Sequence, residues 1–145
     1  MTRGRIHPVQ EPFILRWGPA LLVMVTIFAF SATPGDDLPR FGLVDLLVKK
    51  GGHMAGYALL ALACLRGFGD RTWNKSSSTG RHSFWLAFGL TLAYALTDEL
   101  HQVFTPGRHP SLLDVGVDAA GAALALWLAA RIPRLRGWVT FRVKS

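Results

Sequence analysis

Residues 17–30 read WGPALLVMVTIFAF and contain no charged side chain. Three further apolar segments follow along the chain, at residues 53–65, 84–97 and 112–130. A helix that crosses a membrane needs about 20 mostly apolar residues, and each segment reaches this length when a polar turn at one end is included. Helices of a soluble bundle, the alternative, should carry a polar face at 3.6-residue spacing, but Ala20–Phe30 and Leu86–Leu96 have almost none. The sequence therefore predicts an all-α integral membrane bundle of about four transmembrane helices.

The helices are expected at about residues 14–32, 50–68, 84–104 and 111–131, within a single domain that spans residues 1–145. Between the first two, residues 36–52 mix apolar residues with Asp45, Lys49 and Lys50, which indicates a short helix at the membrane interface. The first segment also has features of a cleaved signal peptide, because a basic leader precedes it and small residues follow it. We expect it to be retained as the first transmembrane helix.

Composition and charge exclude several classes of protein. The chain has 145 residues, of which 50% are hydrophobic and 17% are charged, so it is too apolar to remain disordered. Its single cysteine, Cys64, excludes a disulfide scaffold and a cysteine-ligated zinc site.

The net charge is +7, and 12 of the 16 lysines and arginines lie before the first segment, between the second and third, or after the fourth. This distribution satisfies the positive-inside rule for a multi-pass protein of the cell membrane with both termini in the cytoplasm. The positive charge is therefore assigned to membrane orientation, and we expect no nucleic-acid partner.

Polar side chains gather at the helix ends that this topology places outside the cell. They are Lys50, His53 and Tyr57 in the second helix, Asp98, Glu99 and Gln102 in the third, Arg108 in the next turn, and Ser111, Asp114 and Asp118 in the fourth. Most lie three or four residues apart within a helix and so share one face. Each alone has a structural explanation, such as a helix cap or a headgroup anchor, but a charge at membrane depth costs about 2.5–3.5 kcal/mol on insertion scales. Together they predict one polar cavity that opens to the extracytoplasmic side.

Two stretches of this polar region resemble the VanZ-like family, which is named for a protein linked to teicoplanin resistance. They are K-x-x-H-x-x-x-Y at residues 50–57 and D-E-x-x-Q-x-F-x-P-G-R-x-x-S-x-x-D-V-x-x-D-x-x-G at residues 98–121, within a motif region of about 49–130. The resemblance implies a small multi-helix membrane protein of the bacterial cell envelope. It extends to Lys50, His53, Tyr57, Glu99, Gln102, Pro106, Gly107, Arg108, Ser111, Asp114 and Gly121.

The sequence departs from the family pattern at two positions. Lys49 stands where the family commonly has aspartate, and Asp118 stands where it commonly has asparagine. The second departure adds a possible negative charge to the predicted cavity, so the ligand or the protonation state of this chain can differ from the usual ones.

One hypothesis is an enzyme that acts on a phosphorylated lipid or a lipid-linked envelope precursor at the outer leaflet. His53 or Glu99 would be the general acid or base, and Asp114 would orient His53. Lys50 and Arg108 would hold an anionic group such as phosphate. The remaining substrate-binding candidates are Tyr57, Gln102, Ser111 and Asp118.

A second hypothesis is a non-catalytic binder of a lipid headgroup, a peptidoglycan precursor or a glycopeptide, so the sequence leaves enzymatic activity open. A metal-dependent hydrolase is a third, with ligands drawn from His53, Glu99, His101, Asp114 and Asp118. The chain lacks H-E-x-x-H and Cys/His metal spacings, so we expect no metal and no cofactor. The expected partners are membrane lipids with an anionic or phosphorylated headgroup. Transport is ranked low because the inner halves of the helices lack a polar path.

Overall fold

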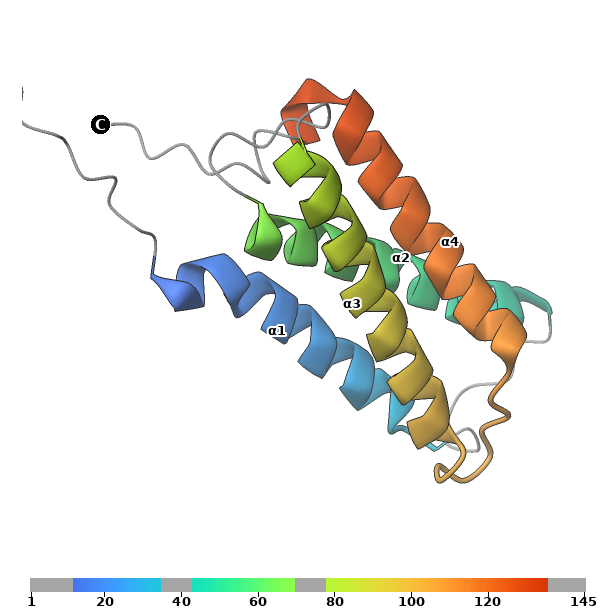
Figure 1. The fold of residues 1–145 in the computed structure, drawn as a ribbon. Coiled ribbons are helices and arrows are strands. Elements are labelled where there is room, and N and C mark those ends of the chain that lie inside the picture. Colours follow the sequence, from blue (N-terminus) through green and yellow to red (C-terminus); the bar gives the residue numbers. More distant parts are fainter. Residues whose placement is uncertain (1–11, 35–42, 70–77, 136–145) are drawn as a thin grey trace, which may run out of the picture.

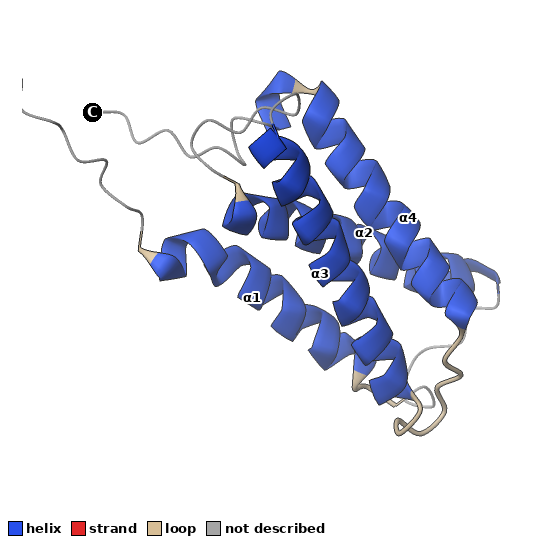
Figure 2. Ribbon diagram, in the orientation of Figure 1, coloured by secondary structure: helices blue, strands red, loops and turns tan. Residues whose placement is uncertain are grey.

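The computed structural model describes residues 12–34, 43–69 and 78–135, with side chains described from residue 50 onward in the second range. Four main helices account for most of these residues. They are α1 (Phe13–Ser31), α2 (Leu43–Phe68), α3 (Ser78–Gln102) and α4 (Leu112–Arg131). Figure 2 shows that the described regular elements are helical, so the predicted all-α class with four main helices is confirmed.

The helix α2 is the centre of the bundle. It packs most extensively against α4 and also contacts α1 and α3, whereas α1 touches α3 only slightly. Figure 1 shows α3 between α1 and α4, with α2 behind them. The most extensive helix contact of this fold is therefore between α2 and α4.

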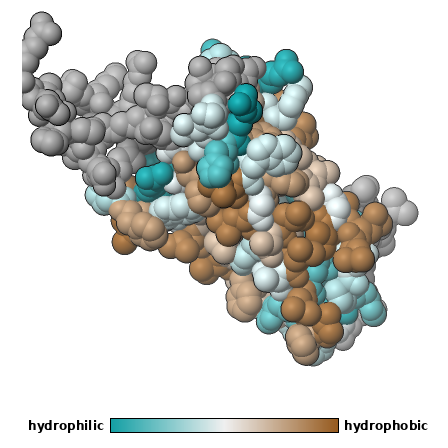
Figure 3. Space-filling view, viewed as in Figure 1, coloured by the Kyte–Doolittle hydropathy of each residue, from teal (hydrophilic) through white to brown (hydrophobic). Residues whose placement is uncertain are grey.

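The core of the bundle consists largely of small residues, while many large apolar side chains face outward. Buried alanines at the helix contacts include Ala61, Ala63, Ala87, Ala95 and Ala122. On α1, by contrast, Ile14 is 73% exposed and Leu22 is 69% exposed. Small residues allow close helix contacts inside a membrane, where burial of large apolar groups gains nothing over lipid. Figure 3 shows hydrophobic residues over much of the middle of the face in view, with hydrophilic residues more frequent toward its two ends.

Two helices, α1 and α4, are long and apolar enough to cross a membrane. Only 11% of the most apolar 18-residue window of α1 is buried, and 39% of that of α4. A core helix of a soluble protein would be mostly buried, and soluble proteins rarely expose large continuous apolar surfaces. The exposed surface of α1 and α4 is therefore suited to lipid.

The helix α2 differs from the sequence-based expectation. It begins at Leu43 and runs without a break to Phe68, so residues 43–50 continue the second helix and do not form a separate interfacial one. The rest of that predicted short helix, residues 36–42, lies outside the described residues. No proline interrupts 43–68, and one added residue extends an existing helix far more easily than a new helix nucleates.

The other boundaries lie closer to those expected. The helix α3 begins at Ser78, before the expected residue 84, because apolar content marks only the middle of a helix that continues through polar residues. The helix α4 ends at Arg131 as expected. Ser111 is its N-cap, and its hydroxyl oxygen accepts a hydrogen bond from the Leu113 backbone N–H at 3.1 Å.

Candidate functional site

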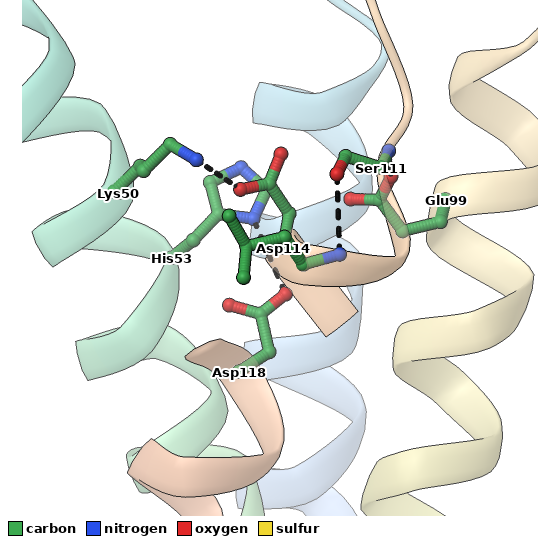
Figure 4. A network of polar contacts seen from close by, with 7 residues as sticks. Lys50, His53, Glu99, Ser111, Asp114 and Asp118 are labelled. Atoms are coloured by element: carbon green, nitrogen blue, oxygen red, sulfur yellow. Dashed lines mark hydrogen bonds and ion pairs between the residues drawn. The ribbon is translucent and has the colours of Figure 1, made fainter. Parts of the chain in front are cut away.

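Two contacts between oppositely charged side chains join α2 to α4. The Lys50 ammonium is paired with the Asp114 carboxylate, and His53 Nδ1 lies 3.9 Å from Asp118 Oδ2. Figure 4 shows these four side chains between the two helices. Spacings of three residues on α2 and four on α4 place both pairs on facing stripes, one helical turn apart. The two helices thus form a polar layer about two turns deep.

The close approach of α2 and α4 depends on Gly121, one turn beyond Asp118. A Cβ atom at this position would lie 2.5 Å from the Met54 carbonyl oxygen and 2.7 Å from Met54 Cγ. Backbone atoms cannot yield as the end of a flexible side chain can, so only glycine fits here. Gly121 therefore sets the helix separation at which the adjacent His53 reaches Asp118.

Glu99 on α3 is tied to the start of α4. Its Oε2 accepts a hydrogen bond from the Ser111 backbone N–H at 2.9 Å, and only 8% of the residue is exposed. The negative charge lies at a helix N-terminus, where free N–H groups and the helix dipole stabilise it. Glu99 thus links α3 to the polar layer between α2 and α4. Figure 4 shows its carboxylate next to Ser111.

A deeper polar group lies on α2 and α3. Gln102 Nε2 donates a hydrogen bond to Asp98 Oδ2 at 3.3 Å. The other carboxylate oxygen of Asp98, Oδ1, and the Tyr57 hydroxyl have no hydrogen-bond partner within the described residues. Asp98 is 4% exposed and Tyr57 is fully buried. Buried polar atoms are nearly always hydrogen-bonded, and the Tyr57 and Asp98 side chains lie close enough to interact with each other.

Arg108 hydrogen-bonds to α1. Its Nη2 donates to the Phe30 carbonyl oxygen at 2.7 Å and its Nε donates to the Thr33 carbonyl oxygen at 3.1 Å. These carbonyls belong to the C-terminal end of α1, where a cation is favourable. The preceding Gly107 has a φ of 70°, a left-handed conformation that glycine adopts without strain. Arg108 therefore joins the α3–α4 turn to α1, and its predicted role in holding an anion stays a prediction.

The structure thus brings most of the predicted site residues into one region but changes their pairing. Asp114 was expected to orient His53, yet it pairs with Lys50, and Asp118 is the carboxylate next to His53. The difference arises because the relative rotation of two helices, which the spacing within each helix does not specify, decides which residues face each other.

The sequence placed Asp98 in the predicted polar cavity but gave it no catalytic or binding role. Its burial and its bond to Gln102 place it in the polar region. The available signal was the i, i+4 spacing of Asp98 and Gln102, which puts them on one helix face.

The acidic residues do not form a metal centre in this arrangement. Among residues 12–34, 43–69 and 78–135, no group of three histidine, cysteine, aspartate or glutamate residues is placed to hold a metal ion. His101 instead lies against Phe28, with ring centroids 4.7 Å apart.

The outward-facing apolar side chains and the small-residue core define a membrane protein with two candidate spans. A family model described as VanZ/LLP1 matches residues 16–133, which include α1 to α4 almost entirely, and the chain belongs to this family. The family membership that the two motifs predicted is thereby confirmed. No curated protein and no solved structure matches the chain.

Proposed function

We propose that this protein is a multi-pass membrane protein of the bacterial cell envelope in which all four helices cross the membrane and both termini are cytoplasmic. The distribution of lysines and arginines supports this orientation, because 12 of 16 lie on the side assigned to the cytoplasm. The polar layer between α2 and α4 then faces the extracytoplasmic side. Its proposed role is to bind a phosphorylated lipid headgroup or a lipid-linked envelope precursor.

The Lys50–Asp114 ion pair is the observation that carries this proposal. The side chains are 38% and 29% exposed, respectively, so a headgroup can reach them. A partly exposed ion pair contributes little stability and exchanges partners at low cost. A phosphate that replaces Asp114 as the partner of Lys50 would form charge-assisted hydrogen bonds of the stronger kind.

Processing of the bound lipid is the second candidate function, favoured by the His53–Asp118 pair. A buried carboxylate beside an imidazole fixes the orientation of the ring and stabilises its protonated form. His53 is 25% exposed and Asp118 is 2% exposed, so the imidazole would face the ligand and the carboxylate would lie behind it. Family membership suggests glycopeptide tolerance as the cellular readout of either function.

The test is to identify lipids that co-purify with the protein. Wild type, Lys50→Ala and Arg81→Ala would be purified in the same detergent and their bound lipids quantified by mass spectrometry. Arg81 is an exposed cation near the start of α3, far from Lys50 along the bundle, and serves as the charge-matched control. We expect a phosphorylated lipid with wild type and Arg81→Ala, and about tenfold less with Lys50→Ala. Equal amounts in all three would overturn the proposal, provided that all three elute as folded protein.

A further inference from the structure

The polar layer carries more negative than positive groups. Together with the deeper Asp98 it contains four carboxylates, Asp98, Glu99, Asp114 and Asp118, and its cations are Lys50 and, when protonated, His53. Arg108 hydrogen-bonds to carbonyl oxygens of α1. A purely anionic ligand would therefore meet an acidic region in which both cations already face carboxylates.

The Lys50–Asp114 pair also determines which charge pattern can enter. An anionic headgroup that binds Lys50 leaves Asp114 without a cation, next to Glu99 and Asp118. A zwitterionic headgroup places its phosphate on Lys50 and its ammonium on Asp114, so each charge keeps an opposite partner. Unpaired charges in a partly buried site are expensive, and the zwitterion avoids that cost.

The partly exposed Asp114 carboxylate favours a ligand with N–H donors. A primary ammonium brings three N–H donors to such a carboxylate. A trimethylated ammonium brings none and is bulkier, so the site should distinguish the two.

We propose that the lipid headgroup bound by this protein is zwitterionic and carries a primary ammonium beside its phosphate, with Lys50 binding the phosphate and Asp114 the ammonium. This inference rests on the proposed function and specifies the ligand class of the same site. Phosphatidylethanolamine has this headgroup chemistry. Phosphatidylglycerol lacks the ammonium, and phosphatidylcholine lacks the N–H donors.

The test is a competition among lipids on the wild-type protein. Delipidated full-length protein in detergent is mixed with equimolar phosphatidylethanolamine, phosphatidylglycerol and phosphatidylcholine of the same acyl chains, and bound lipid is counted by native mass spectrometry. We expect phosphatidylethanolamine to exceed each of the others by about tenfold. N-acetylation of its amine should remove this preference without any change in the protein.

Variants separate failure of this inference from failure of the proposed function. Asp114→Asn should remove the preference for phosphatidylethanolamine over phosphatidylglycerol. Asp70→Asn, the same charge change outside the two motif stretches at residues 50–57 and 98–121, should retain it. Equal or stronger binding of phosphatidylglycerol by wild type that still depends on Lys50 would overturn the inference and leave the proposed function standing. Lipid binding that is unaffected by Lys50→Ala would overturn both.

Discussion

The cationic side chains at the two ends of α2 contact different kinds of acceptor. At the Phe68 end, Arg16 Nε donates to the Gly67 carbonyl oxygen at 2.6 Å and Arg66 Nη2 donates to the Leu15 carbonyl oxygen at 3.2 Å. At the other end, Lys50 and His53 face the carboxylates of Asp114 and Asp118. Both carbonyl oxygens lack a helical donor, because Gly67 lies in the last turn of α2 and the residue four positions after Leu15 is Pro19, which has no N–H. Side-chain carboxylates, in contrast, can exchange a cation for a ligand. The first end thus joins α1 to α2, and the second has the chemistry of a binding site.

Arg108 also donates to backbone carbonyl oxygens, although it lies in the α3–α4 turn, at the same end of the bundle as Lys50. Its partners are the carbonyl oxygens of Phe30 and Thr33 at the end of α1. The cations therefore differ in their partner atoms, backbone carbonyls or side-chain carboxylates, and not in their position in the bundle. We expect substitution of the arginines bonded to carbonyls to lower stability, and substitution of Lys50 to weaken lipid binding.

The largest expected effect comes from the helix contact on which the carboxylate end depends. Gly121→Ala places a Cβ atom 2.5 Å from the Met54 carbonyl oxygen, so α4 must move away from α2. We expect the free energy of unfolding to fall by about 2 kcal/mol, measured by denaturation in detergent micelles, together with loss of lipid binding.

Gly116→Ala is the matched control on the same helix, because a Cβ atom there meets nothing within 4 Å. It should leave stability unchanged or raise it by up to about 1 kcal/mol, since alanine favours helix over glycine. Equal losses for the two variants would contradict the proposed role of the Gly121 contact.

Arg108→Ala should have the next largest effect. It removes two hydrogen bonds from a charged donor to α1, and we expect unfolding to become easier by about 1.5 kcal/mol. The lipid preference should persist, because the Lys50–Asp114 pair remains. Arg108→Lys keeps the charge but loses the forked geometry, so it should recover only part of the stability. A loss of lipid binding at unchanged stability would instead make Arg108 an anion clamp.

Arg16→Ala should act in the same way but more weakly. The side chain donates to Gly67 and Gly69 carbonyl oxygens, and the residue is exposed, so solvent replaces part of what is lost. A decrease of about 1 kcal/mol in the free energy of unfolding is expected. Lipid binding at the far end of α2 should be unchanged in the same preparation, and a change there would contradict the separation of the two ends.

Lys50→Ala should have the smallest effect on stability and a large one on binding. The ion pair with Asp114 is partly exposed, so the free energy of unfolding should change by less than about 1 kcal/mol. Thermal denaturation compared with Arg81→Ala, measured alongside the bound-lipid assay, checks this. A destabilisation as large as that of Arg108→Ala would assign Lys50 to the structural contacts.

Much of the fold and of the candidate site followed from local pattern. Apolar segments located the four main helices, and spacings of three and four residues placed Lys50 with His53 and Asp114 with Asp118 on shared faces. The extension of α2 back to Leu43 was missed, because residues 43–49 have an ambiguous apolar pattern and hydropathy does not mark helix ends.

The sequence by itself determined the helical class, the family and the residue types at the polar end, because hydropathy and helical periodicity are properties of each segment alone. Tertiary structure alone decided that Asp118 meets His53, that Asp114 meets Lys50 and that Arg108 reaches α1. Those pairings depend on the rotation and separation of neighbouring helices. Contacts such as that of Gly121 with Met54 set this geometry, and they join residues distant in sequence that no single-helix pattern relates.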